Sequence, residues 1–206
     1  MQTFLYLLIT GTFIGCNVYS LSAQADRVVG GRCEGCEALH DRSPARMLAS
    51  DTLDGYGERG TPLHLFGTVR HASGAPAGGV ILYVYHTNER GLYEAAPTAT
   101  GFALRHGQHR GWVKTGADGR YDFFTFRPAS YPNSGAPAHI HLTVKEPGTI
   151  AHYLDDFLFT DDPFLTPKVR ATQPGRGGSG ICTPNWQKGA WRVQRDICLG
   201  QAVPGY

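Results

Sequence analysis

The segment Ala138-His139-Ile140-His141 places two histidines two residues apart, on either side of an isoleucine. In an extended strand, residues i and i+2 point to the same face, so the two imidazoles would lie side by side. Ile140 would point the other way, into a hydrophobic core. Because imidazole is the commonest protein ligand for metals, the segment predicts a strand that carries two metal ligands on one face.

Two tyrosines lie on segments that would flank this strand. Tyr131 is followed by Pro132 and preceded by Pro128, which places it on a rigid loop just ahead of the histidines. Tyr93 comes at the end of the segment that follows the apolar run 80–85. A tyrosine that binds a metal must lose its proton, so a metal here would have to lower a pKa that is ordinarily near 10.

The rest of the sequence is typical of strands separated by turns. The 206 residues include 27 glycines and 13 prolines, aromatic residues are frequent, and no long amphipathic helical repeat is present. We therefore expect an all-β protein with a two-sheet β-sandwich and a short helix near residues 45–49. Core strands are expected over residues 63–70, 80–87, 111–115, 121–126, 139–144 and 156–159, with a final hairpin within 180–199.

The chain is expected to have three parts: an export signal over residues 1–25, an irregular N-terminal segment over 26–60, and the sandwich domain over 61–206. The first 25 residues carry no charge, and Ala23-Gln24-Ala25 matches a signal-peptidase cleavage pattern. The protein would then be exported, to the periplasm or the extracellular space. An alternative interpretation makes Cys16 a lipidated residue that tethers the protein to a membrane without spanning it.

The charge of the chain excludes one class of partner. The formal net charge is +2, and no run or stripe of Lys and Arg is present. Binding of nucleic acid requires such a basic patch, so we expect no nucleic-acid partner.

Four cysteines remain when Cys16 is set aside, an even number that suits disulfides in an oxidising compartment. Four cysteines allow three pairings. We favour Cys33–Cys36 and Cys182–Cys198, because the second pair flanks a predicted hairpin turn almost symmetrically. The C-x-x-C of Cys33 and Cys36 lacks a second C-x-x-C or neighbouring histidines, which argues against a zinc site.

The order of these motifs resembles that of the intradiol ring-cleavage dioxygenases, the family of protocatechuate 3,4-dioxygenase and catechol 1,2-dioxygenase. The resemblance runs from about residue 67 to residue 163, roughly half of the chain. Any single motif is weak evidence, but the ordered set with two tyrosines and a His-x-His is specific. The motifs are Gly67-Thr68-Val69, residues 83–88, Gly91-Leu92-Tyr93, residues 115–123, Tyr131-Pro132, residues 137–141, Phe157-Leu158-Phe159 and Asp162-Pro163.

The resemblance implies a mononuclear Fe(III) centre, with Tyr93 and His141 as equatorial ligands and Tyr131 and His139 as axial ligands. It further implies cleavage of a catechol-type ring by O₂, between the two hydroxylated carbons, to a muconate-type dicarboxylate. Tyr131 would leave the metal and act as the general base for the substrate. No organic cofactor or external reductant is needed, because both oxygen atoms enter the substrate. The family commonly forms dimers or larger assemblies, so a homo-oligomer is also expected from the resemblance.

The sequence departs from the family pattern at two positions. An arginine that stabilises negative charge on the substrate usually lies three residues before the first histidine, where this chain has Ala136. Arg105 or Arg110 is the candidate to supply that charge from another loop, as a catalytic residue. Asp156 replaces a glutamine of the family and changes the polarity of the pocket.

Two alternatives to the active enzyme remain at this stage. A non-catalytic, prealbumin-like β-sandwich that serves as a binding module would make Tyr93, Tyr131, His139 and His141 ordinary packing and strand residues. An iron-binding but weakly active relative would keep the four ligands and lose rate through Ala136. The sequence does not name the catechol, although an exported enzyme would meet phenols from outside the cytoplasm.

Overall fold

The computed structural model describes residues 25–41 and 43–206. The predicted export signal and the alternative lipidation of Cys16 fall outside the described residues, apart from Ala25 at the end of the signal. None of the described helices has the length and apolar character needed to cross a membrane.

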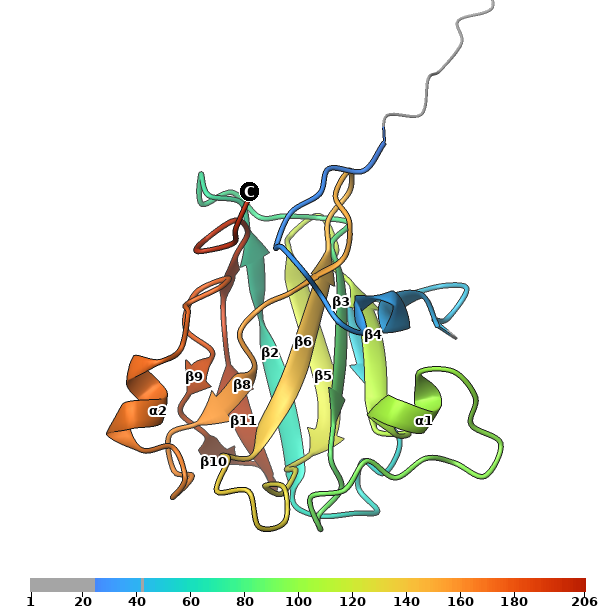
Figure 1. The fold of residues 1–206 in the computed structure, drawn as a ribbon, viewed down its shortest axis with the longest axis vertical. Helices are drawn as coiled ribbons and strands as arrows, with labels where there is room; N and C mark the ends of the chain where they lie inside the picture. The colour runs from blue at the N-terminus through green and yellow to red at the C-terminus, as the bar shows by residue number, and fades with distance from the viewer. Residues whose placement is uncertain (1–24, 42) are drawn as a thin grey trace, which may run out of the picture.

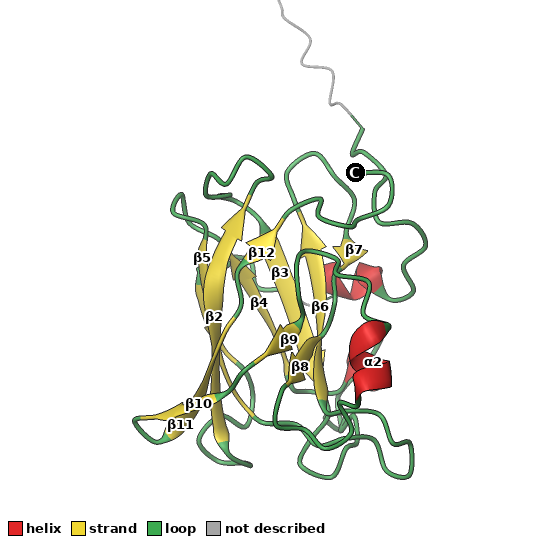
Figure 2. Ribbon diagram, turned by 90° about the vertical axis from the view of Figure 1, so that its left-hand side faces the viewer, coloured by secondary structure: helices red, strands yellow, loops and turns green. Residues whose placement is uncertain are grey.

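Two β-sheets pack face to face, which confirms the predicted all-β, two-sheet sandwich (Figures 1 and 2). The first sheet has the order β1 (Ser50–Thr52), β5 (Arg120–Phe126), β2 (Pro62–Arg70), β11 (Ala190–Gln194) and β10 (Asn185–Gln187), and β12 (Ile197–Cys198) also pairs with β2. The second sheet has the order β4 (Arg110–Lys114), β3 (Ile81–His86), β6 (His139–Lys145), β8 (Phe157–Phe159) and β9 (Ile181–Cys182), and β7 (His152–Tyr153) also pairs with β6.

Within the described residues, three short helices lie outside the sheets: the 3₁₀ helix η1 (Cys36–His40), α1 (Ala103–His106) and α2 (Pro167–Ala171). The expected helix near residues 45–49 is wrong. These residues form an irregular connection, and the helical turn comes earlier, directly after the N-terminal disulfide. β1 was also not predicted, because its pairing with β5 depends on contacts with a segment that is distant in the sequence.

The core lies between the two sheets and follows the period-2 alternation of the strands. In β6, Ile140, Leu142 and Val144 are buried in this core, whereas His139 and His141 are only partly buried on the opposite face. The strand thus presents its two histidines on the outer face of the second sheet, as the sequence predicted.

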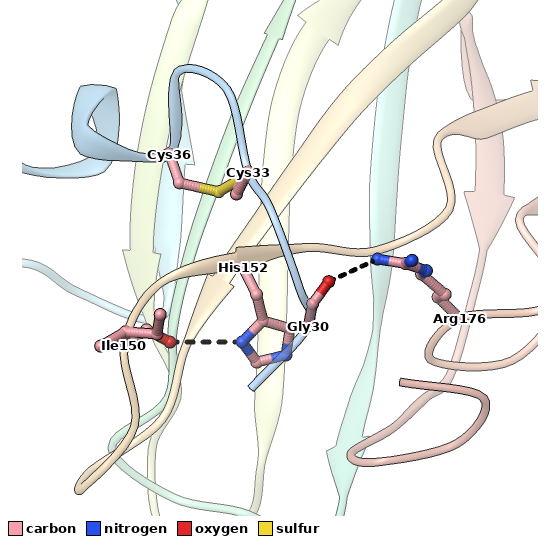
Figure 3. Close-up of a disulfide and its surroundings, with 6 residues drawn as sticks. All are labelled: Gly30, Cys33, Cys36, Ile150, His152 and Arg176. Carbon is pink, nitrogen blue, oxygen red and sulfur yellow. Dashed lines mark hydrogen bonds between the residues drawn. A yellow bond between two sulfur atoms is a disulfide. The ribbon is translucent and has the colours of Figure 1, made fainter. Parts of the chain in front are cut away.

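The structure confirms one predicted disulfide and contradicts the other. Cys33 and Cys36 are bonded (Figure 3), whereas Cys182 and Cys198 are free thiols. The predicted hairpin exists as β10 and β11, but it ends before it reaches the cysteines. Cys182 belongs to β9 in the second sheet and Cys198 to β12, which pairs with β2 of the first sheet, so the two residues do not face each other across one ladder.

The N-terminal segment crosses the outer face of the second sheet as an extended strap, drawn in blue in Figure 1. Arg27 forms an isolated parallel bridge with Thr149. Further on, the carbonyl oxygen of Gly30 accepts a hydrogen bond from Arg176 Nη1 at 3.0 Å (Figure 3). Gly30 has a φ of 82°, and a Cβ atom there would overlap with the side chain of His152. Glycine at this position therefore lets the strap lie directly on the sheet.

His86, at the end of β3, connects the two sheets through a buried hydrogen bond. Its Nδ1 donates to the carbonyl oxygen of Thr87 at 2.7 Å, so its Nε2 accepts from Oγ1 of Thr125, in the other sheet, at 2.6 Å. Burial lowers the pKa of His86 to about 3. The folded protein thus keeps this imidazole neutral at pH values where the unfolded chain, with an ordinary pKa near 6.5, binds a proton.

We predict that this histidine makes the protein less stable in acid. The folded-state pKa is depressed, so the contribution is present above pH 6.5 and is lost progressively as the pH falls towards 3. The free energy of unfolding should decrease by about 1.4 kcal/mol per pH unit for this one group between about pH 6 and 4. Urea titrations at several pH values measure how the free energy of unfolding changes with pH. In a His86→Gln variant this slope should be smaller by about 1.4 kcal/mol per pH unit, which corresponds to the uptake of one proton. Equal slopes in the two proteins would show that His86 is not the responsible group.

Candidate metal centre

The register between β3 and β6 positions one end of the site. Tyr85 of β3 lies opposite His141 of β6, and Arg110 of β4 lies on the other side of Tyr85. Directly opposed residues share a face of the sheet, and the rings of Tyr85 and His141 stack with centroids 4.4 Å apart. His139 is the first residue of β6, where the strand emerges from the loop that carries Tyr131.

Two loops bring the tyrosines to this face. Tyr93 follows β3, and Tyr131 lies between β5 and β6. Two hydrogen bonds of Ala129 help to join the loops: Thr87 Oγ1 donates to the carbonyl oxygen of Ala129 at 2.7 Å, and the backbone N–H of Ala129 donates to the carbonyl oxygen of Asn88 at 3.2 Å. The relative position of the two phenols is therefore set by direct contacts between the loops.

Gly91 allows the closest approach between these loops. Its φ is 77°, in the left-handed region, and a Cβ atom there would overlap with the carbonyl oxygen of Ser130. A side chain at this position would have to push the loop of Tyr93 away from the loop of Tyr131.

The four predicted ligands converge on one point. The Oη atom of Tyr93 lies 2.5 Å from Oη of Tyr131 and 2.8 Å from Nε2 of His141. The Oη atom of Tyr131 lies 3.1 Å from Nε2 of His139 and 3.4 Å from Nε2 of His141. Two phenol oxygens and two imidazole nitrogens thus form a compact cluster, half-buried at the end of the sandwich.

The second ring nitrogen of each histidine has a fixed acceptor. Nδ1 of His139 donates to the carbonyl oxygen of Pro137 at 2.8 Å, and Nδ1 of His141 donates to Oδ1 of Asp156 at 3.1 Å. Both protons are therefore held on Nδ1, which leaves the lone pairs of the two Nε2 atoms directed into the cluster. This arrangement is typical of histidines that bind a metal. The sequence alone identifies neither acceptor and indicates for Asp156 only an effect on the polarity of the pocket.

The pKa values of the cluster reflect its burial. Burial raises the pKa of Tyr93, and the hydrogen bond between Tyr93 and Tyr131 raises it further. Burial also raises the pKa of Tyr131, and it lowers the pKa of His139, which keeps this imidazole neutral. Burial alone would raise the pKa of Asp156, but its interaction with His141, which includes the hydrogen bond, lowers it overall, so Asp156 is ionised at neutral pH.

A second set of ligands can be compared with this one. His139, His141 and Asp156 offer ligand atoms within 4.8 Å of one another. Asp156, however, binds Nδ1 of His141, on the opposite edge of the ring from Nε2. We therefore assign Asp156 as the group that orients His141, and the two tyrosines and two histidines as the set whose atoms point to a shared centre. Two anionic phenolates with two neutral imidazoles suit a hard trivalent ion such as Fe(III).

The two candidate arginines lie in different environments. Arg105 of α1 lines a cavity of about 300 Å³ together with Tyr93, Tyr131 and His141. Arg110 is 7% exposed and pairs with Asp41 at 3.4 Å, with its guanidinium over the ring of Trp112. Arg105 is thus the candidate that the structure places beside the cluster of predicted ligands. Arg110 lies on β4, one strand further from His141 than Tyr85.

The chain matches a family model described as "Dioxygenase" over residues 36–176, more than half of its length. Among curated proteins it is 35% identical over 103 residues to catechol 1,2-dioxygenase 1 of Acinetobacter lwoffii, a match that covers 41% of this chain and 32% of that protein. It is 28% identical over 108 residues to 6-chlorohydroxyquinol 1,2-dioxygenase of Cupriavidus pinatubonensis. This match covers 45% of this chain and 38% of that protein. The matches thus span less than two fifths of the length of these two relatives.

Solved structures show the same fold. The dioxygenase domain of a dioxygenase carbohydrate-binding protein fusion from Streptomyces sp. SirexAA-E is similar with a TM-score of 0.58 and 24% identity, over 85% of this chain and 97% of that one. Catechol 1,2-dioxygenase from Acinetobacter sp. ADP1 is similar with a TM-score of 0.58 and 22% identity, over 76% of this chain and 59% of that one. Together with the match of the family model, these results show that the chain belongs to the intradiol dioxygenase family.

Proposed function

We propose that this protein is a non-haem Fe(III)-dependent dioxygenase that opens a catechol-type ring with O₂, between the hydroxylated carbons, to a muconate-type dicarboxylate. The observation that carries the proposal is the convergence of Tyr93, Tyr131, His139 and His141 on one point. The names of the relatives support the substrate class, because they include catechol, chlorocatechol and hydroxyquinol 1,2-dioxygenases. No external reductant is required, because both atoms of O₂ enter the product.

Each residue of the site has a role in this reaction. When bound, ferric iron would act as a Lewis acid that favours the doubly deprotonated form of a catechol. Tyr131 is the proposed base: its pKa is raised by burial, so its phenolate accepts a proton readily at Oη. Tyr85 forms a wall of the cavity, with its ring stacked between His141 and His106. Arg105 supplies the positive charge nearest to the substrate, in place of the arginine that Ala136 replaces.

We also propose that the protein is exported. The uncharged, apolar N-terminal sequence supports this proposal, and so does the Cys33–Cys36 disulfide, because structural disulfides persist in oxidising compartments.

A second candidate function is an iron-binding protein with weak dioxygenase activity. The observation that favours it is Ala136, an uncharged residue on the loop between Tyr131 and His139. The loss of one stabilising charge from a developing anion typically costs about 10² to 10³ in rate.

The experiment that tests the proposed function is oxygen uptake by the iron-loaded protein with catechol, followed by identification of the product. Stoichiometric O₂ consumption with formation of a muconate is the expected result, and the iron-free protein should be inactive. Bound iron without turnover would contradict the proposed activity. An Ala136→Arg variant then separates the two candidates, because restored turnover would show that the missing arginine limits the rate.

A substitution of Asp156 tests its role in orienting His141. Asp156→Ala removes the acceptor of the Nδ1 proton and should weaken the binding of Fe(III) by about 10- to 100-fold. Asp156→Asn keeps an acceptor oxygen in place and should bind iron more tightly than the alanine variant. A competition titration with a ferric chelator measures both affinities. If Asp156→Ala bound iron as tightly as the wild type, the carboxylate would have no part in the metal site.

A substitution of Gly91 tests whether the approach of the two loops builds the site. Gly91→Ala introduces a Cβ atom against the carbonyl oxygen of Ser130 and should separate the two phenols, with loss of most of the iron-binding capacity. Gly135→Ala is the matched control: Gly135 has a φ of 66° in the same region, but nothing lies within 4 Å of its Cβ position. That variant should lose only about 1–2 kcal/mol of stability and still bind iron. Equal iron content in both variants would contradict the proposed role of Gly91.

A further inference from the structure

The loop closed by the Cys33–Cys36 disulfide lies beside the cluster of predicted iron ligands. A Cβ atom on Gly35 would be 3.3 Å from Nε2 of His106, so the loop is in close contact with this ring. The ring of His106 stacks on Tyr85 with centroids 3.7 Å apart and an angle of 3°, and Tyr85 stacks on His141. A continuous series of aromatic rings thus connects the disulfide loop to a predicted iron ligand.

Contacts on both sides hold this loop in place. Before it, Gly30 is fixed on the sheet by Arg176 and by its close packing against His152 (Figure 3). After it, the carbonyl oxygen of Leu39 in η1 accepts a hydrogen bond from Nε1 of Trp112 at 2.9 Å. The disulfide closes the turn between these anchors, so the backbone of the loop is held beside the cavity.

Glu34 lies between the two cysteines and lines the same cavity as Tyr93, Tyr131 and His141. Its Oε1 accepts a hydrogen bond from Nη2 of Arg105 at 2.9 Å. The two side chains are 88% and 58% exposed, which places the ion pair at the mouth of the cavity. They are the two residues with full formal charges among those that line this cavity. Glu34 therefore neutralises the cation that faces the substrate.

The ion pair has a consequence for the choice of substrate. A catechol with a carboxylate on its ring could gain from Arg105 only by displacing Glu34, and it would then lie beside an unpaired carboxylate. A catechol with a cationic substituent would be attracted by Glu34, and an uncharged catechol would be affected least. Because like charges at an interface suppress the wrong partner, Glu34 provides discrimination against anions.

We propose that Glu34 is a specificity-determining residue that selects against catechols with anionic ring substituents. The inference rests on the proposed function, since it concerns the substrate of the same site.

Equilibrium binding to the iron-loaded protein without oxygen tests the proposal. The probes are catechol, 3,4-dihydroxybenzoate and 4-(2-aminoethyl)catechol, and the dissociation constants are measured by calorimetry. Glu34→Gln should improve the binding of 3,4-dihydroxybenzoate relative to catechol by about threefold to fivefold, the size expected for an exposed charge. The aminoethyl probe should change in the opposite direction. Both effects should be largest near 10 mM salt and should nearly vanish near 1 M, because salt screens exposed charges.

Two further variants complete the experiment. Glu37→Gln removes the same charge from an exposed position of η1 that lines a different cavity, and it should leave the ratios of the three probes unchanged. Arg105→Gln leaves Glu34 unpaired and should weaken the binding of 3,4-dihydroxybenzoate relative to catechol. This opposite shift keeps the proposal testable if Glu34→Gln fails to fold.

The outcomes separate this inference from the proposed function. If the wild type binds catechol and the ratios are the same in Glu34→Gln, Glu37→Gln and the wild type, the role of Glu34 is overturned and the proposed function stands. If the iron-loaded wild type binds none of the probes, the proposed function is overturned and this inference with it. A shift that persists at high salt would also contradict the proposal, because it would indicate a change of shape rather than of charge.

Discussion

The site depends on the register of β6 in the second sheet. Burial of Ile140, Leu142 and Val144 in the core leaves one face of the strand for His139 and His141. A shift of one residue would bury the histidines and expose the isoleucine, so the hydrophobic effect that stabilises the sandwich also fixes the orientation of two proposed metal ligands. The pairing with β3 then places Tyr85 against His141, and this contact begins the series of rings that reaches the N-terminal loop.

The other two proposed ligands, Tyr93 and Tyr131, lie on loops, where hydrogen bonds between the loops rather than strand pairing hold them in place. The two tyrosine loops are joined through Thr87 and Asn88, and Gly91 lets them touch. The result is a cluster in which the pKa of each phenol is raised and both histidines keep their protons on Nδ1. The two phenol oxygens and two imidazole nitrogens thus point to one centre, as the donor atoms of a metal site would.

Much of this could be predicted from the sequence, because the information was local. The alternation around Ile140 predicted the ligand strand, and the order of motifs predicted the family and the sandwich. The predicted pairing of Cys182 with Cys198 was wrong. Two residues placed symmetrically about a turn can still belong to different sheets, as these two do. Two features could not be predicted: the contact of Asp156 with His141, and the position of Glu34 at the cavity. Both depend on segments that are distant in the sequence, and no spacing in the sequence indicates such contacts.

The proposed function requires that two tyrosines and two histidines of this chain hold one ferric ion. The most direct test is the iron content and visible spectrum of the protein after ferric loading, compared with Tyr93→Phe. We expect one iron per chain and a coloured protein with a phenolate-to-iron charge-transfer band, and we expect the variant to lose or shift this band. A wild-type protein that stays colourless and takes up no ferric iron would contradict a ferric site built from these four residues.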